Sequence, residues 1–286
     1  QSERVTSADA SYILKTPKVK ARLTGFYTKI QDATEISFFY GEGIGSDDGG
    51  DEDTFVSEIV SGIDKQNMGV ELGLEYNITS TIKATAAASY GQYLFSDNAR
   101  LKTNDDALAA AGNNSLTDFG TVYIKNYHQP GMPQTAASFG LEYRDPNFWW
   151  IGANVNYLAN SYVDFANILR TDNFSIDSAT GDNYTGATPE TVRAILKQEK
   201  FDSFTLVNLT GGKSWRISIA NRNTVGFFAS VNNVFDIQYK TGGFEQGRNA
   251  NYQSLKEDFS TPKRRFGPKY WYGRGTNYFL NLYFRF

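Results

Sequence analysis

The amino-acid sequence predicts an all-β fold, an antiparallel transmembrane β-barrel with long loops at one end and short turns at the other. Three observations support this prediction. The final strand has one apolar face that continues to the last residue, the connections alternate between short and long, and no segment reads as a membrane-spanning helix. A barrel strand faces lipid on one side and the lumen on the other, so residues two apart must share a chemical character.

The last strand, expected over 276–286, shows this alternation most clearly. Its apolar face consists of Tyr278, Leu280, Leu282, Phe284 and Phe286, and its other face is dominated by Asn277, Asn281, Tyr283 and Arg285. An apolar exterior, a polar interior and a terminal aromatic residue are typical of the closing strand of a transmembrane barrel. We expect the apolar face to contact outer-membrane lipid. We expect Phe284 and Phe286 to form a signal for the barrel-assembly machinery.

The composition is compatible with a barrel. The 286 residues include 18 Tyr, 21 Phe and 26 Gly but no Cys, and the mean hydropathy is -0.45. No apolar run approaches the roughly 18 to 20 residues that a membrane helix requires. A barrel can be polar on average because only alternate residues meet lipid. The lack of Cys excludes disulfides and thiolate metal sites, and a net charge of -3 provides no basic field for nucleic acid.

Nine strands are expected from this alternation and from the turn residues between them. They cover residues 3–16, 19–31, 68–78, 81–95, 134–144, 148–164, 204–218, 223–236 and 276–286. In GVELGLEY, Glu71 and Glu75 alternate with apolar residues, and in WWIGANVNYL the same is true of Asn154 and Asn156. Two glutamates on the same face of one strand cannot face lipid. We therefore assign these polar side chains to a hydrated lumen.

The connections between the strands alternate in length. Short turns rich in Pro, Asn, Asp and Ser are expected at 16–19, 77–81, 144–148 and 219–224. Long loops are expected at 32–67, 96–133, 165–203 and 237–275. Such loops are uncommon in compact soluble domains but usual on one side of an outer-membrane barrel.

The strand count also predicts where the chain ends lie. If Phe286 is periplasmic, nine antiparallel strands place residue 1 outside the cell, whereas a complete single-chain barrel has an even number of strands. The sequence begins at Gln1 with neither an initiator Met nor a signal peptide. We interpret the chain as the C-terminal portion of a longer protein, so strands 3–16 and 276–286 should not pair with each other. The alternative is a mature barrel of ten strands.

Several segments carry a family resemblance. They are SADASYILKTPKVKARLTGFYTKIQD, GVELGLEYNITSTIKATAAASYGQYLF, GMPQTAASFGLEY, GKSWRI, SVNNVFD and GTNYFLNLYFRF. Together they resemble the second half of the barrel of a TonB-dependent outer-membrane receptor, specifically of the SusC-like or Oar-like kind. The resemblance touches every expected strand, is weak in the long loops, and is most specific in SVNNVFD. It implies a barrel of about 22 strands around a plug domain, with residues 1–286 forming its C-terminal strands.

The resemblance also implies a function. Receptors of this kind import a bulky nutrient (a glycan, a peptide or a metal chelate) across the bacterial outer membrane with energy delivered by TonB. The implied partners are TonB, through the N-terminal part, and a SusD-like surface lipoprotein or other outer-membrane subunits. Two alternatives stay open: a receptor-like barrel that is a structural subunit of a larger assembly, and a stand-alone small porin or barrel enzyme. No cofactor is expected.

Residues for catalysis are sparse. His128 is the single histidine, so motifs that need two histidines for zinc cannot form within this chain. GEGIGS at 41–46 is neither a nucleophile elbow nor a complete phosphate-binding glycine motif. We therefore expect no enzymatic activity, and we expect His128 to pack in a loop between Tyr127 and the proline turn.

An acidic loop is a weak candidate for metal binding. GSDDGGDEDT at 45–54 contains Asp47, Asp48, Asp51 and Asp53 among glycines. Carboxylates at this density could bind a hard cation, but their spacing differs from that of a calcium-binding loop. A solvated loop tip is the preferred interpretation.

A short helix is expected in the third long loop. PETVRAILKQEK at 189–200 places Val192, Ile195 and Leu196 on one face. We interpret this helix as a cap that rests on neighbouring loops, and the alternative is a docking site for a partner.

The last long loop holds the candidate ligand-binding residues. KRRFGPKYWYGRG at 263–275 contains Arg264, Arg265, Tyr270, Trp271 and Tyr272. Aromatic faces can stack on sugar rings or peptides while cations bind acidic groups. The alternative is that these aromatics belong to the interfacial girdle of the barrel.

Overall fold

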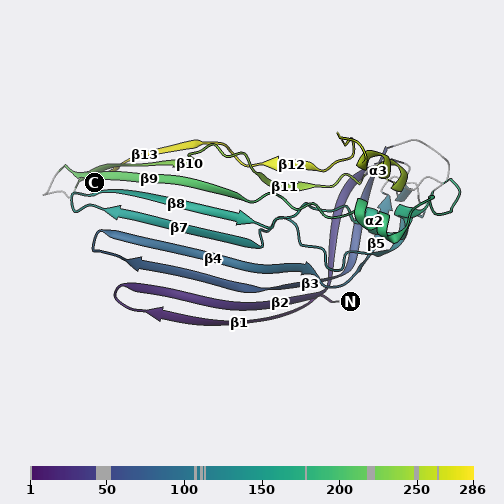
Figure 1. Cartoon of the computed structure of the whole chain (residues 1–286), viewed down its shortest axis with the longest axis horizontal. Coiled ribbons are helices and arrows are strands. Elements are labelled where there is room, and N and C mark those ends of the chain that lie inside the picture. Colours follow the sequence, from purple (N-terminus) through teal and green to yellow (C-terminus); the bar gives the residue numbers. More distant parts are fainter. Residues whose placement is uncertain are drawn as a thin grey trace.

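The computed structural model describes residues 2–42, 53–105, 108–109, 112, 114–177, 179–217, 223–247, 251–262 and 264–286. Within this part of the chain, nine strands form one continuous antiparallel path (Figure 1). Their order is β1 (Arg4–Lys15), β2 (Val19–Glu42), β3 (Asp53–Asn77), β4 (Ile82–Phe95), β7 (Thr135–Arg144), β8 (Trp149–Ala159), β9 (Phe204–Arg216), β10 (Thr224–Asn232) and β13 (Asn277–Arg285). The all-β antiparallel prediction is confirmed, and each expected strand has a counterpart.

The register of the sheet separates an apolar face from a polar face. One row of neighbours across five strands consists of Leu23, Leu72, Ala88, Ala137 and Tyr157. Every member of this row is apolar or aromatic, as expected for a surface in contact with lipid.

The opposite face is polar, and its side chains bond across the strands. Lys20 Nζ lies 2.9 Å from Glu75 Oε1, and the Ser138 hydroxyl donates to Asn156 Oδ1 at 2.8 Å. This polar face is the one that we assigned to a hydrated lumen from the glutamates and asparagines in the sequence.

Aromatic side chains form two belts on the apolar face. Tyr76, Trp149 and Trp215 lie near the short turns, and a second belt near the loops consists of Tyr27, Tyr90, Tyr157 and Tyr278. On β8, Trp149 and Tyr157 are eight residues apart, which is about 26 Å along the strand and about 20 Å along the axis of a barrel with the usual tilt. The two belts therefore have the spacing expected of the two membrane interfaces.

The short turns lie together at one end of the sheet, at the left of Figure 1. In the first turn the backbone N–H of Thr16 donates to the Val19 carbonyl at 2.8 Å, and in the second Ile78 donates to Ile82 at 2.9 Å. In the third, Asp145 Oδ1 accepts from the Asn147 N–H at 2.8 Å. The fourth expected turn, 219–224, lies mostly outside the described residues.

The expectation of an unstructured first long loop was wrong. β2 continues to Glu42 and β3 begins at Asp53, so most of 32–67 is a two-stranded extension of the barrel wall. The pairing of β2 with β3 is irregular between Ile30 and Glu35, and Asp32 has a φ of 58°. This bulge shifts the alternation of side chains, which explains why the sequence pattern ended the strand at residue 31.

A hairpin formed by β5 (Ala99–Asp105) and β6 (Leu116–Val122) occupies much of the second expected loop. β5 pairs with the extension of β3, so the hairpin adds two strands to the main sheet. The buried residues between these extensions include Val60, Ile63, Phe95, Leu101, Val122 and Ile124. This core stabilises the wall beyond the loop-side aromatic belt.

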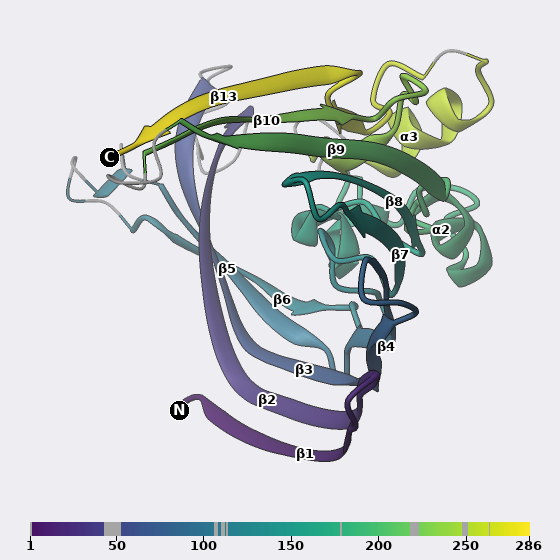
Figure 2. The same ribbon diagram turned by 90° about the vertical axis from the view of Figure 1, so that its left-hand side faces the viewer.

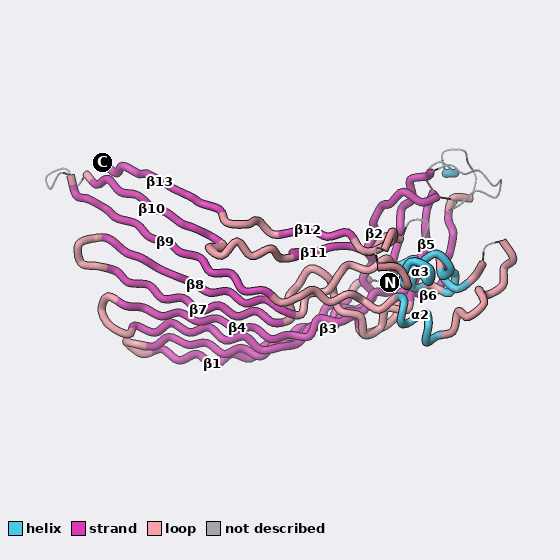
Figure 3. The backbone as a smooth tube through the Cα atoms, turned by 45° about the horizontal axis from the view of Figure 1, so that its top comes forward, coloured by secondary structure: helices cyan, strands magenta, loops and turns pink. Residues whose placement is uncertain are grey.

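Short elements gather in the remaining long connections, and Figure 3 shows their helices together at the loop end. They are η1 (Asn167–Arg170), η2 (Asp172–Ser175), α2 (Pro189–Ile195), β11 (Lys240–Phe244), α3 (Tyr252–Phe259) and β12 (Lys269–Tyr272). β11 and β12 pair in a small sheet of their own. β8 ends at Ala159, before the predicted residue 164, because Asn160 adopts a φ of 60°. No described helix is long and apolar enough to cross a membrane.

The sheet is open between its edge strands. β1 pairs with β2 and β13 pairs with β10, and within the described chain β1 and β13 do not pair with each other. Figure 2, which looks at the turn end, shows the two strands on separate margins of a curved wall. The expectation that strands 3–16 and 276–286 remain apart is confirmed.

Candidate functional site

The loop end is organised around the side chain of Arg170, which is 1% exposed. Its Nη1 donates to the Ala166 carbonyl at 3.1 Å, and its Nη2 donates to the Leu196 carbonyl at 3.0 Å and to Glu245 Oε1 at 2.9 Å. The guanidinium carbon lies 5.0 Å from the ring centroid of Tyr127. Arg170 thereby connects three of the long loops.

Backbone bonds reinforce the same junction. The Asp164 N–H donates to the Gly243 carbonyl at 2.9 Å, and the Glu245 N–H donates to the Asp164 carbonyl at 2.8 Å. The Ala166 N–H donates to Glu245 Oε2 at 3.3 Å. The segment after β8 is therefore held beside β11 by backbone hydrogen bonds and by the carboxylate of Glu245.

Asp164 lies in an acidic neighbourhood at this junction. Partial burial of its carboxyl, followed by the negative charges of Glu35, Glu245 and Glu58, raises the pKa of Asp164 to about 6. Like charges and loss of solvent both disfavour the ionised form of a carboxyl group. The junction therefore contains a group that titrates well above the usual range for aspartate.

Tyr270, one of the predicted ligand-binding residues, is held within the loops. Its hydroxyl donates to Glu199 Oε2 at 2.7 Å, and Lys240 Nζ donates to Glu199 Oε1 at 2.9 Å. The same ammonium lies 3.5 Å from the Tyr270 ring centroid. Burial, together with the hydrogen bond and charge of Glu199, raises the pKa of Tyr270.

Trp271 and Tyr272 remain accessible on β12, with 57% and 62% of their surfaces exposed. The Trp271 ring lies 5.6 Å from that of Phe244 across the small sheet. Both residues precede Tyr278, which occupies the loop-side aromatic belt, so they lie on the loop side of this belt. They stay candidates for ligand contact.

Arg264 and Arg265 lie in the turn that follows α3. Arg264 packs its guanidinium 4.5 Å from the Phe259 ring centroid, and the Arg265 N–H donates to Asp258 Oδ1 at 2.6 Å. The Phe266 N–H donates to the second oxygen of the same carboxylate at 2.9 Å. Burial opposes the charged form of Asp258, but these donors and the two arginines outweigh it and lower its pKa. Both arginine side chains themselves are exposed.

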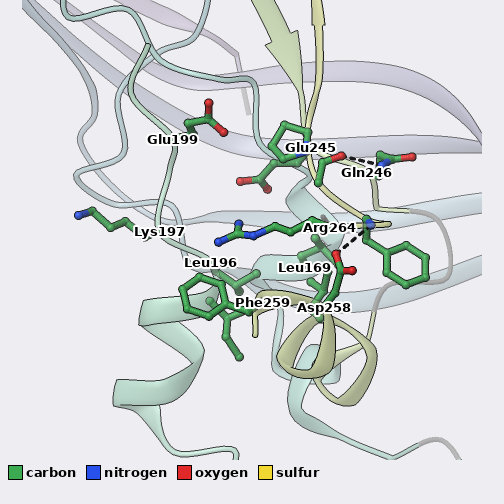
Figure 4. A pocket seen from close by; sticks show the side chains of 14 residues that line it. Leu169, Leu196, Lys197, Glu199, Glu245, Gln246, Asp258, Phe259 and Arg264 are labelled. Carbon is green, nitrogen blue, oxygen red and sulfur yellow. Dashed lines mark hydrogen bonds between the residues drawn. The ribbon is translucent and has the colours of Figure 1, made fainter. Parts of the chain in front are cut away.

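A small cavity lies between these elements (Figure 4). Its volume is about 70 Å³, and charged side chains in its wall include Lys197, Glu199, Glu245, Asp258 and Arg264. Pockets for small-molecule ligands have volumes of about 300–1,000 Å³. The cavity is therefore too small to hold a bulky nutrient.

His128 packs inside the loop cluster. Its ring stacks on Tyr162 with 3.8 Å between centroids, and Gln134 Nε2 lies 2.6 Å from its Nδ1. Burial lowers the pKa of His128, the bond to Gln134 opposes this effect, and the charge of Lys200 adds to it. The stacking partner is Tyr162, which the sequence did not indicate.

The acidic loop is mostly outside the described residues. Asp47, Asp48 and Asp51 belong to the undescribed segment, and Asp53 is described only as the first backbone position of β3. Across the residues that the structure does describe, no group of three or more His, Asp or Glu side chains could hold a metal ion. Metal binding by the acidic loop stays a prediction.

The predicted helix at 189–200 is present but shorter. α2 ends at Ile195, and Thr188 caps it by accepting from the Thr191 N–H. Val192 and Ile195 pack against a buried cluster of Leu169, Phe174, Leu196 and Tyr252. The apolar face of the helix therefore rests on neighbouring loops, in agreement with the interpretation as a cap.

The comparisons with known proteins point to one family. A family model described as the β-barrel of TonB-dependent receptor-like proteins matches residues 1–234. A comparison with curated protein sequences found no match.

Among solved structures, the chain is similar to a copper transporter, OprC, with 20% identity and a TM-score of 0.51 over 98% of this chain and 30% of that one. It also matches the ferric-catecholate import receptor Fiu of Escherichia coli K12, with 15% identity, 98% and 27% coverage and a TM-score of 0.49. A third match is the ferripyoverdine receptor of Pseudomonas aeruginosa, with 11% identity, 97% and 26% coverage and a TM-score of 0.47.

The structural likeness to the copper transporter supports the fold alone, and the two weaker likenesses carry no further argument. The chain spans about 30% of that transporter's length. The family model, in contrast, covers most of the sequence and most strands of the main sheet. This chain belongs to the TonB-dependent receptor-like β-barrel family.

Proposed function

We propose that this chain forms part of the wall and external loops of an outer-membrane receptor that imports a bulky nutrient with energy from TonB. The observation that carries the proposal is the two-faced sheet: an apolar face between two aromatic belts, and a polar face with cross-strand bonds such as Lys20–Glu75. An exposed apolar face bounded by two aromatic belts, opposite a polar face, is the pattern of a wall between lipid and a hydrated lumen.

The open edges support a larger barrel. Unpaired backbone groups on β1 and β13 would each cost several kcal/mol in a bilayer. We propose that strands from elsewhere in the receptor cover both edges, and that its N-terminal part supplies the plug and the segment that contacts TonB. The barrel-assembly machinery would insert the receptor, with Phe284 and Phe286 as its signal.

We further propose the class of the nutrient, the residues that contact it and a partner at the cell surface. The cargo would be a glycan, a peptide or a metal chelate, and Trp271, Tyr272 and the basic Arg264 and Arg265 would contact it from the last loop. The exposure of these four residues supports this role. A SusC-like receptor would in addition carry a SusD-like lipoprotein above its loops.

A genetic experiment tests the import function. The receptor gene and the tonB gene would be deleted singly and together in the native bacterium, and growth would be compared on media that limit metals, glycans or peptides. Import predicts a defect on one nutrient in both single mutants and no further defect in the double mutant.

Two results would contradict import. Normal growth on every medium, combined with loss of another outer-membrane complex, would favour the structural subunit. A native protein of only 31.9 kDa that conducts ions without TonB would favour the small porin.

A further inference from the structure

A groove opens beside the Arg170 junction, on the side of Tyr123. Its volume is about 860 Å³, and its wall combines the segment around Tyr123, the two 3₁₀ helices and α2. This volume lies within the usual range of ligand pockets. The groove is distinct from the small cavity of Figure 4 and from the basic and aromatic residues of 263–275.

Hydrogen bonds hold the segments that form the walls of the groove in place. The Tyr123 N–H donates to the Arg170 carbonyl at 2.7 Å, and the Tyr127 hydroxyl donates to the Leu196 carbonyl at 3.0 Å. The Tyr252 hydroxyl contacts Thr191 Oγ1 of α2 at 3.2 Å. A ligand would therefore meet a surface that is already ordered, which lowers the entropic cost of binding.

The lining has both a flat aromatic face and hydrogen-bonding groups. The Tyr123 side chain is 49% exposed, and its hydroxyl lies 3.4 Å from Asp172 Oδ2. The amides of Asn98 and Asn183 also reach the groove. These groups can donate and accept hydrogen bonds at several points around one ring face.

Positive charge exceeds negative charge on the rim. Arg193 on α2 is exposed; its charge acts on the nearby Glu190, but within the described chain no carboxylate forms a salt bridge with it. Lys125 lies 3.7 Å from Asp97 in a solvent-exposed pair. Asp172 is the only carboxylate among the described lining residues. The rim is therefore suited to an acidic substituent near Arg193.

Other ligand classes fit this lining less well. A hard cation takes six to eight oxygen ligands, of which one carboxylate and two amides supply few, and the positive charges of Lys125 and Arg193 would repel it. A purely apolar ligand would displace water from Asp172 and from the two amides without offering hydrogen bonds in return, which costs free energy for each group that loses a water partner. A sugar ring offers an apolar face for stacking and hydroxyls around its edge, so it satisfies both parts of the lining.

We propose that the Tyr123 groove binds an acidic oligosaccharide. A sugar ring stacks on Tyr123, its hydroxyls bond to Asp172 and Asn183, and its carboxylate pairs with Arg193. The assignment deepens the proposed function, on which it rests for the identification of this saccharide as cargo.

The test uses the purified full-length receptor in detergent. Binding would be measured on an array of neutral and uronic-acid oligosaccharides and then by calorimetry with the strongest oligosaccharide. Tyr123→Ala and Arg193→Ala should each raise Kd at least about tenfold. Tyr123→Phe should preserve stacking and stay within about threefold, and Lys18→Ala, in the short turn between β1 and β2 at the opposite end of the sheet, should leave Kd unchanged. Heat-modifiable mobility would verify that each variant is folded.

Three results would overturn the proposal: no uronic-acid oligosaccharide binds, binding is unchanged in folded Tyr123→Ala and Arg193→Ala, or only peptides from a casein digest bind. A different result would refute the import function. If the oligosaccharide binds through Tyr123 but its uptake does not require TonB, the groove is supported and TonB-driven import is refuted. If growth still depends on TonB while the Kd of the oligosaccharide is the same in both variants as in the wild type, only the proposed binding site in the groove is refuted.

Discussion

Arg170 and Glu245 are 75 residues apart in the sequence and form a buried ion pair between two loops of the barrel. Their side chains are 1% and 14% exposed. Arg170 also binds the Leu196 carbonyl and packs on Tyr127, so the pair fixes the relative positions of loops that enter from different hairpins. The loop end consequently behaves as one packed layer.

Glu245→Ala should loosen this layer without disrupting the barrel. Removing one partner of a buried ion pair leaves an uncompensated charge and costs about 3–5 kcal/mol. Trypsin treatment of intact cells should then cleave the loops faster, while heat-modifiable mobility is retained. Arg100→Ala is the control, because the Arg100–Asp118 pair is exposed and worth about 0–1 kcal/mol. Equal cleavage of the two variants would contradict the role of the buried pair.

Leu72→Lys should reduce assembly in the membrane. Leu72 lies between Leu23 and Ala88 on the apolar face, where a lysine near the bilayer midplane costs about 2–4 kcal/mol. Asn154→Lys on the polar face should be tolerated. The yield of folded protein in outer-membrane fractions measures both effects, and similar yields would show that the faces are assigned incorrectly.

Phe286→Ser should lower the amount of receptor inserted in the outer membrane. The Phe286 side chain is 93% exposed and lies 6.0 Å from the Phe284 ring, so it has little role in packing within this chain. An assembly defect would therefore reflect recognition or contact with lipid. Arg285→Ser, on the other face, serves as the control, and wild-type levels of folded Phe286→Ser would refute the signal.

Asp164 should make loop packing weaken as pH rises. The unfolded chain releases this proton near pH 4, whereas the folded protein releases it near pH 6. Between these values the folded state binds more protons, so its stability falls with increasing pH.

Asp164→Asn should reduce this dependence. Loop protection from a protease active across the range should then fall less steeply from pH 4 to 6.5 than in the wild type, and a smaller slope should remain because burial also raises the pKa of Glu58. At pH 7 the protection should exceed that of the wild type. Asp202→Asn changes an exposed carboxylate before β9 and should retain the wild-type slope. A slope as steep in Asp164→Asn as in the wild type would show that another group is responsible for the titration.

The local sequence pattern was sufficient for the membrane wall. Alternation around Leu72 and Asn154 identified the strands and their two faces, because lipid and water select side chains at every second position. Proline and asparagine identified the tight turns, and Val192 and Ile195 identified the apolar face of α2.

The candidate ligand site was predictable only in part. The mixture of basic and aromatic residues identified Trp271 and Tyr272, which are accessible, but it could not show that Glu199 holds Tyr270. Tyr123 and Arg193 gave no signal of their own because the groove forms between segments distant in the sequence.

Tertiary structure alone decided the arrangement beyond the loop-side belt. The bulge at Asp32 shifts the alternation of side chains in the second half of β2. β5 and β6 extend the wall because the outer part of β3 has an edge with which β5 can pair. The Arg170–Glu245 pair and the His128–Tyr162 stack join residues 75 and 34 positions apart. A periodic pattern depends only on the solvent at each side of one strand, whereas these contacts depend on which loops the folded chain brings together.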